Sequence, residues 1–261
     1  MSINVVITGA NRGIGFALVQ EFSEDDELKN MFACCRNPVD AEQLKALAST
    51  DSRIHLIRMD VSDPISISKA AQEVAVAVEK LVGSDGVNLL INNAGTNEGH
   101  CTDGPQSFLG AEQQTYLKIY NVNAIGPVIV SKEFLPLLKT ASQKYSDKEV
   151  LNVKRAAIVN VSSGLASISS NTTGSSSFPN VAYRCSKTAL NQFTKTAAVD
   201  LADKGILVVS CCPGWVRTDM GGPYAPINAS ESAKCLLATF SRFDKSSSGG
   251  FFNLSGEREN Y

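Results

Sequence analysis

The sequence has no excess of charge of either sign. Its 24 Lys and Arg residues nearly balance its 26 Asp and Glu residues, so the formal net charge is -2. Proteins that bind nucleic acid or an anionic membrane surface present clusters of basic side chains, and no such cluster occurs here. We therefore expect no nucleic acid and no membrane among the partners. A nearly neutral surface suits an enzyme that acts on a small molecule.

Long apolar runs are missing as well. Met1 leads directly into the segment 3–7, without the basic region and the extended apolar region of a signal peptide. No run reaches the roughly 18 apolar residues that a membrane-spanning helix requires. These absences predict a cytoplasmic protein.

The sequence lacks the residue patterns that bind metals. Its two histidines, His55 and His100, lie far apart, and its seven cysteines form no CxxC pair and no Cys/His cluster with zinc spacing. We predict no metal site. An odd number of cysteines without an export signal indicates free, mostly buried thiols in a reducing compartment.

Short β-branched apolar segments alternate with longer segments of helical periodicity almost from end to end. The first kind predicts strands at 3–8, 31–35, 54–59, 87–92, 156–162, 206–211 and 250–254. The second kind predicts helices near 13–23, 40–49, 64–82, 112–141, 181–203 and 230–241. Several strands lack polar alternation, as expected where helices cover both faces of a sheet. Such alternation builds right-handed βαβ units. We predict one α/β domain over residues 1–261, with a doubly wound, mostly parallel seven-stranded sheet of Rossmann type.

A glycine-rich turn follows the first predicted strand. Gly9, Gly13 and Gly15 have the spacing Gly-x3-Gly-x-Gly, which differs from the common GxGxxG pattern, and an apolar helical segment comes next. Glycines allow a tight turn and a close approach to a pyrophosphate, whose charge the helix N-terminus stabilises. An ordinary strand-to-helix turn can also be rich in glycine, but the position after the first strand favours dinucleotide binding.

The end of the second predicted strand indicates which dinucleotide is bound. NAD-binding proteins carry an acidic residue there for the ribose 2′-hydroxyl, whereas this chain reads Ala33-Cys34-Cys35-Arg36-Asn37. Arg36 can pair with a 2′-phosphate, and Arg12 in the glycine turn is a second cation nearby. Each arginine alone could be an ordinary surface charge. Together, with the acid missing, they favour NADP(H).

Over its whole length the sequence resembles the short-chain dehydrogenase/reductase family, because a set of motifs occurs in the family's order. These motifs are the cofactor turn at 8–15, Asp60-Val61 for the adenine, the NNAG segment at 92–95, Asn123 within 121–127, Val161-Ser162-Ser163, the YxxxK signature Tyr183-Arg184-Cys185-Ser186-Lys187, and the PG…T segment at 213–218. One YxxxK match means little, whereas the ordered set is specific.

The resemblance implies the residues of the site. Its catalytic residues are Asn123, Ser163, Tyr183 and Lys187. The cofactor-binding residues, including those argued above, are Gly9, Asn11, Arg12, Gly13, Ile14, Gly15, Arg36, Asp60, Val61, Asn93, Ala94, Gly95, Tyr183, Lys187, Pro213, Gly214, Val216 and Thr218. By the same resemblance, Asn123 bends its helix and holds a water that links Lys187 to solvent.

The chemistry of the YxxxK pair follows from its spacing. Residues four apart share a helix face, so Tyr183 and Lys187 can reach one site. A free phenol has a pKa near ~10 and is a poor acid–base catalyst at neutral pH. We expect the Lys187 ammonium to lower the pKa of Tyr183. The same spacing would also fit a core tyrosine beside a lysine that extends to solvent, but the accompanying motifs favour catalysis.

Either of two adjacent serines could be the residue that contacts the substrate oxygen. Aligning Asn160 with the family's VN(V/I)xS pattern puts Ser163 at the catalytic position, where its hydroxyl can donate to the developing oxyanion. Ser162 is the alternative, because successive strand residues point to opposite faces.

The spacing between Ser163 and Tyr183 is longer than is usual in the family. The extra residues fall in a polar loop, 169–180, which we expect beside the substrate opening. With 182–184 and 215–220, this insertion resembles the sniffer-type and C-factor-like carbonyl reductases, which reduce aldehydes, ketones or quinones with NADPH. The resemblance therefore implies a small-molecule carbonyl substrate. The segment 223–226 is either a substrate lid hinged on the preceding glycines or a surface turn.

The same residues allow two other functions. An NADP-linked alcohol dehydrogenase acting on a steroid or lipid would use them in the oxidative direction, and a catalytically silent dinucleotide-sensing protein would only bind the cofactor. Family members often pair through the helices beside their fourth and fifth strands, so the resemblance also implies a homodimer. The segment 112–141 offers a face for it, or packs within one subunit.

Overall fold

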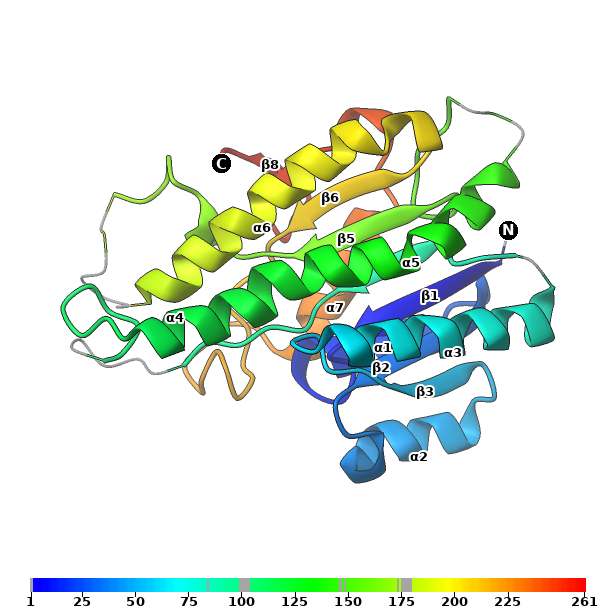
Figure 1. Cartoon of the computed structure of the whole chain (residues 1–261), viewed down its shortest axis with the longest axis horizontal. Coiled ribbons are helices and arrows are strands. Elements are labelled where there is room, and N and C mark those ends of the chain that lie inside the picture. The colour runs from blue at the N-terminus through cyan, green and yellow to red at the C-terminus, as the bar shows by residue number, and fades with distance from the viewer. Residues whose placement is uncertain are drawn as a thin grey trace.

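One continuous sheet connects the chain from its beginning to its end (Figure 1). The computed structural model describes residues 2–83, 85–98, 104–145, 147, 149–172, 174 and 180–261. The strands are β1 (Ile3–Thr8), β2 (Leu28–Cys35), β3 (Ile54–Arg58), β4 (Leu89–Asn92), β5 (Ala157–Val161), β6 (Leu207–Cys211), β7 (Phe251–Phe252) and β8 (Arg258–Glu259). Their order is β3-β2-β1-β4-β5-β6-β7-β8, which is the doubly wound arrangement that the sequence predicts.

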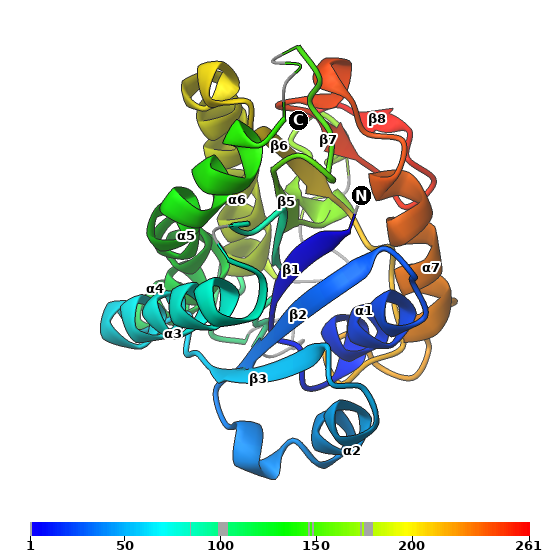
Figure 2. The same cartoon turned by 90° about the vertical axis from the view of Figure 1, so that its right-hand side faces the viewer.

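Helices join the strands and cover both faces of the sheet. They are α1 (Gly13–Ser23), α2 (Glu42–Thr50), α3 (Pro64–Val82), α4 (Gln113–Tyr120), α5 (Gly126–Gln143), α6 (Val181–Asp200) and α7 (Ala229–Phe240). Single 3-10 turns span Pro38–Asp40, Gly164–Ala166, Ala202–Lys204 and Lys245–Ser247. Figure 2 shows α1, α2 and α7 on one side of the sheet and α3 to α6 on the other.

The two layers of the core follow from the alternation of side chains along each strand. Val5 and Ile7 of β1 pack with α1 and α7 in one apolar cluster, whereas Val6 packs with α3, α5 and α6 in the other. Because both faces are covered, the central strands are buried throughout. All eight strands of the described chain share this sheet, which supports treating residues 1–261 as one domain.

Two features differ from the predicted elements. An eighth strand, β8, runs antiparallel to β7; its two residues are too few to leave a periodic pattern in the sequence. The predicted helix at 112–141 is divided by a π-helical turn at Asn121–Ile125, between α4 and α5. Such turns occur often at functional sites, and this one contains Asn123.

Candidate active site

The carboxyl ends of the parallel strands bring most of the predicted site residues together. The glycine turn follows β1, Asn93–Gly95 follow β4, Ser163 follows β5 and Pro213 follows β6. In a doubly wound sheet, ligands bind at this edge, where the connections diverge to opposite faces. The first turn of α6, with Tyr183, lies over the same edge.

The glycine turn packs too closely against its neighbours to carry side chains. A Cβ on Gly9 would lie 2.9 Å from the Cα of Ala94, and one on Gly15 would lie 2.1 Å from the carbonyl oxygen of Gly9. Gly9 also has a φ of 67°, which strains other residues. Glycine at these two positions lets the turn pack this closely, and the turn leads into the N-terminus of α1, where a pyrophosphate can bind.

Hydrogen bonds tie the turn to the NNAG segment. The Thr8 hydroxyl accepts from the backbone nitrogens of Asn93 and Ala94, both at 3.0 Å, and the Asn93 amide donates to the Thr8 carbonyl at 2.9 Å. The ends of β1 and β4 thereby form one rigid floor. Asn93 acts here through the backbone of the turn, which explains why an asparagine suits this position.

Asn123 connects this floor to α6. Its amide oxygen accepts from the Thr96 backbone nitrogen at 2.8 Å, and its amide nitrogen donates to the Thr96 carbonyl at 2.8 Å and to the Ser186 hydroxyl at 3.1 Å. A Cβ on Gly95 would lie 3.4 Å from the Asn123 amide oxygen and 3.6 Å from the Lys187 ammonium. Asn123, Gly95 and Lys187 therefore surround one small space. The water predicted for Asn123 stays a prediction.

Ser163 and Tyr183 meet at the end of β5. The side chain of Ser163 forms a hydrogen bond with the Tyr183 phenol. The hydroxyl of Ser162 instead donates to the Asn191 amide oxygen at 2.7 Å, and Ser162 is only 2% exposed. Of the two serines, Ser163 is the one beside the tyrosine. The Lys187 ammonium lies 5.9 Å from the centre of the Tyr183 ring and donates to the Val161 carbonyl at 2.8 Å.

The expected lowering of the tyrosine pKa is not what the structure shows. Burial raises the pKa of Tyr183 to about 12, and the hydrogen bond with Ser163 opposes this only in part. Burial lowers the pKa of Lys187 to about 8. Desolvation penalises the charged form of both groups. Because the Lys187 ammonium turns to a backbone carbonyl, it does not offset the burial of the phenol.

The residues predicted for the adenosine half of the cofactor are more exposed. The Arg36 guanidinium is exposed, and no hydrogen bond or ion pair engages it within the described part of the chain. Arg12 forms an ion pair with Asp219 at 2.6 Å, in which both side chains are largely exposed. The Asp60 carboxylate accepts from the Ser62 backbone nitrogen at 2.9 Å and from its hydroxyl at 2.6 Å.

The segment after β6, from Pro213 to Thr218, extends to the glycine turn. The Pro213 carbonyl accepts from Ser232, and Val216 pairs with Ile227. The methyl group of Thr218 would lie 3.2 Å from a Cβ on Gly13, so this segment packs against the turn.

The remaining predicted residues lie in several parts of the site. Gly214 has a φ of 80°, and Ile14 packs against the apolar core. Asn11 is half-buried in the glycine turn, and the Val61 carbonyl faces Gly126.

The loop predicted beside the substrate opening, 169–180, and the segment 223–226 are described to different extents. Arg217 donates to the carbonyls of Ala225 and Pro226 at 2.8 and 3.0 Å, which holds the segment 223–226 in place, while Tyr224 is 88% exposed. Whether this segment is a lid or a surface turn stays open. Of the insertion at 169–180, residues 173 and 175–179 lie outside the described residues.

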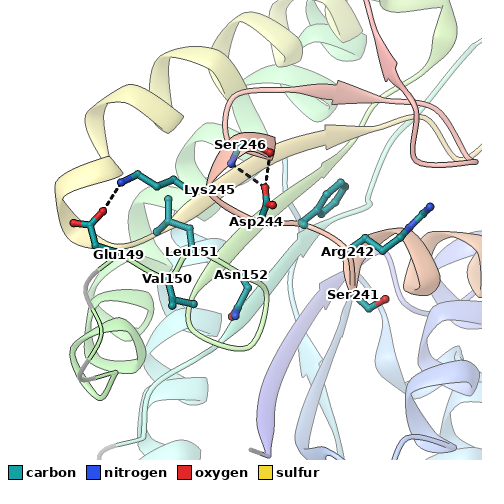
Figure 3. Close-up of a pocket in the computed structure, with 10 residues that line it drawn as sticks. Glu149, Val150, Leu151, Asn152, Ser241, Arg242, Asp244, Lys245 and Ser246 are labelled. Atoms are coloured by element: carbon teal, nitrogen blue, oxygen red, sulfur yellow. Dashed lines mark hydrogen bonds and ion pairs between the residues drawn. The ribbon is translucent and has the colours of Figure 1, made fainter.

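A surface hollow lies at the opposite edge of the sheet (Figure 3). Its walls are residues 149–152, which precede β5, and 241–246, which follow α7. Both segments adjoin the amino-terminal ends of strands, and none of the predicted site residues lines the hollow. The site proposed from the sequence therefore does not coincide with it.

Comparison with known proteins identifies the family. The sequence profile described as short chain dehydrogenase matches residues 4–227. The chain belongs to this family. Short-chain dehydrogenase anuI of Penicillium roqueforti is 34% identical over 240 residues, which cover 89% of this chain and 86% of that protein.

Solved structures of this short-chain dehydrogenase fold include close matches. Carbonyl reductase Sniffer of D. melanogaster superimposes with a TM-score of 0.91 and 34% identity, covering all of both chains. An NADPH-bound carbonyl reductase from chicken fatty liver superimposes with a TM-score of 0.90 and 34% identity, covering 100% of this chain and 94% of that chain. The predicted likeness to sniffer-type reductases is confirmed.

Some residues at the site of this short-chain dehydrogenase were not predicted from its sequence. Cys212 accepts a hydrogen bond at its sulfur from the Gly164 backbone nitrogen at 3.1 Å, and Asp219 pairs with Arg12. Ser186, within the YxxxK signature, donates to the Tyr183 carbonyl at 2.7 Å. The contacts of Cys212 and Asp219 leave no motif in the sequence, because each joins residues that lie far apart in the chain. The six described cysteines are all free thiols, and Cys101 lies outside the described residues.

Among the described residues, no helix is both long enough and apolar enough to cross a membrane. The predicted cytoplasmic location and the predicted homodimer stay predictions.

Proposed function

We propose that this protein reduces an aldehyde, ketone or quinone with NADPH, and that Tyr183 gives the proton to the substrate oxygen. The observation that carries this proposal is the contact between Ser163 and the half-buried Tyr183 at the carboxyl edge of the sheet. The similarity to carbonyl reductases over the full chain supports the substrate class.

The residues present fit a dinucleotide. The turn from Gly9 to Gly15 leads into the N-terminus of α1, whose backbone nitrogens suit a pyrophosphate, and Gly9 and Gly15 have no room for a Cβ. NADPH, when bound, supplies the hydride that goes to the carbonyl carbon. Arg36 and Arg12 are the cations available for its 2′-phosphate, and Asp60 is the acid proposed to meet the adenine.

Ser163 and Tyr183 have different roles at the carbonyl oxygen of the substrate. The Ser163 hydroxyl can donate to this oxygen as negative charge develops. Tyr183, whose pKa is raised to about 12, is protonated at neutral pH and can transfer its proton to the same oxygen. The products are an alcohol and the oxidised cofactor, and the proton on Tyr183 is then restored from solvent.

Lys187 and Asn123 act beside this pair. The ammonium of Lys187 lies within reach of the space under Gly95, where it can hold the cofactor's ribose hydroxyls. Asn123 fixes the backbone of Thr96 and therefore the shape of that space.

The same residues serve reduction and alcohol oxidation, because the step is reversible. Tyr183 acts as the neutral phenol in reduction and as the phenolate in oxidation, and the ratio of reduced to oxidised cofactor sets the direction. A protein that only senses the dinucleotide would need neither the Ser163–Tyr183 contact nor a lysine buried beside it.

The test is NADPH oxidation with a panel of quinones, aldehydes, ketones and steroids, using the native chain and Tyr183→Phe. We expect turnover with at least one carbonyl class, and a loss of at least about 10²-fold in kcat for Tyr183→Phe. NADPH affinity, measured by fluorescence titration, should change little. Near-native turnover by Tyr183→Phe would refute its role as proton donor, and tight NADPH binding without turnover on any carbonyl would favour the sensor.

A further inference from the structure

The helix α6 carries both Tyr183 and Lys187, so its position along β5 determines where the two groups reach. Apolar helix–sheet contacts are not directional and tolerate small shifts. Directional hydrogen bonds between buried partners do not tolerate them. The face of α6 that meets the sheet is hydrogen-bonded to three successive residues, the last two of β5 and the one that follows.

The three bonds lie on one stripe of the helix. Lys187, Asn191 and Thr194 are spaced by four and three residues and therefore share a face. Lys187 donates to the Val161 carbonyl at 2.8 Å, Asn191 accepts from the Ser162 hydroxyl at 2.7 Å, and Thr194 accepts from the Asn160 amide at 2.8 Å. Polar groups from three consecutive residues, 160–162, thus seat the helix.

The middle bond, between Ser162 and Asn191, lies next to the proposed active site. Ser162 adjoins Ser163 in the chain, and Asn191 lies one helical turn beyond Lys187. Ser162 and Asn191 are 2% and 1% exposed. The Asn191 amide nitrogen is buried and has no hydrogen-bond partner within the described residues. An apolar residue would avoid the desolvation of that group, so packing alone does not account for an asparagine here.

We propose that Ser162 and Asn191 are positioning residues, which set the register of α6 so that Tyr183 and Ser163 reach the same substrate oxygen. This inference rests on the proposed reductase function. Neither residue contacts the reacting atoms; both act through the groups beside them. A displacement of about 1 Å between reacting groups can lower turnover about a hundredfold, so a small slip of the helix is enough to matter.

The chain offers a matched control one turn farther along α6. The Ser210 hydroxyl and the Thr194 hydroxyl form a 2.7 Å hydrogen bond, again between a strand serine and an α6 side chain, and both residues are fully buried. Ser210→Ala therefore removes a comparable bond between α6 and the sheet. Because Thr194 keeps its bonds to Asn160 and to the Leu190 carbonyl, α6 remains seated.

The experiment compares Ser162→Ala with Ser210→Ala in the full chain. We expect both variants to lose a few degrees of Tm, by similar amounts. Only Ser162→Ala should lower kcat, by about tenfold or more, with the Kd for NADPH within about twofold of the native value. Asn191→Leu should lower kcat to the same degree, and the double variant should be no slower than either single one.

Other outcomes overturn the inference. Equal kcat for the two alanine variants, or a loss in Ser162→Ala that appears only as weaker NADPH binding, would reduce the pair to a structural role. If Ser162→Ala does not fold, Asn191→Leu and Ser162→Thr, which keeps the hydroxyl, decide instead: the first should be slow and the second close to native. Absence of turnover by the native chain itself would overturn the proposed function as well, which separates the two failures.

Discussion

The two halves of the proposed cleft are built in different ways. In the catalytic half, around β4, β5 and α6, Asn123 and Lys187 are at most 4% exposed and hydrogen-bonded, and the half-buried Tyr183 contacts Ser163. In the cofactor half, around β1 and β2, the charged groups Arg12 and Arg36 lie at the surface. A proton donor must be placed within a fraction of an ångström. A cation that recognises a phosphate can remain mobile, because the attraction is long-ranged and needs less exact geometry.

The strongest test of this difference between the two halves is Ser163→Ala in the catalytic half. The variant removes a donor to the substrate oxygen and the hydrogen bond that lowers the pKa of Tyr183. We expect kcat to fall by about 10²–10³-fold while NADPH affinity stays the same. Steady-state kinetics and a fluorescence titration measure the two quantities. Ser162→Ala, expected to be less severe, is the natural comparison, and equal losses would contradict the assignment of Ser163.

In the cofactor half, Arg36→Ala should act on binding and not on chemistry. Loss of a charged pair with the 2′-phosphate is expected to raise the Kd for NADPH by about tenfold to a hundredfold. The Kd for NADH should stay unchanged, and the salt dependence of NADPH binding should weaken. An equal effect on both cofactors would mean that Arg36 does not meet the 2′-phosphate.

The pH dependence of reduction distinguishes the two proposed catalytic groups, Tyr183 and Lys187. With its pKa raised to about 12, Tyr183 keeps its proton throughout the neutral range, so it imposes no decline there. Lys187, with its pKa lowered to about 8, loses its charge as the pH rises through that value. We expect kcat to be level near neutrality and to decrease several-fold above about pH 8. Lys187→Arg should move this decline upward, because arginine stays charged; an unchanged profile would place the titration elsewhere.

The smallest expected effect concerns the ion pair across the cofactor half. Asp219→Asn removes the partner of Arg12, but exposed pairs contribute at most about 1 kcal/mol. We expect a change in Tm no larger than that of Asp203→Asn, which breaks another exposed pair, with Lys204. Affinity for NADPH should rise by at most a few-fold, because Arg12 becomes free for the phosphate. If the affinity for NADPH falls instead, Asp219 supports the loop that it belongs to.

Local patterns predicted the elements better than their ends or interruptions. The apolar run at 3–8 and the helical segment predicted at 64–82 correspond to β1 and to α3. The π-helical turn at Asn121–Ile125 was not predicted as such, because its helical neighbours continue the same periodicity. β8 was missed because pairing with β7, and not its own composition, makes it a strand.

At the site, chain order was enough to name Ser163, Tyr183 and Lys187 as candidates and to place them near one edge. It was not enough to predict their electrostatics. The pKa of Tyr183 was expected to fall through a neighbouring charge, whereas burial, which depends on how α4, α6 and the NNAG segment pack, makes it rise. The proposed positioning role of Asn191 could not be predicted either, since the sequence of a helix does not show which residue its asparagine will bond to.

The sequence by itself determined the fold class, the order of motifs and the chemical groups at the carboxyl ends of the strands, because these follow from local periodicity and from residue type. The tertiary structure alone decided which serine faces Tyr183, that Arg12 pairs with Asp219, and how α6 is seated on β5. Each of these depends on contacts between residues that lie far apart in the chain, and only packing and burial decide which of the available partners meet.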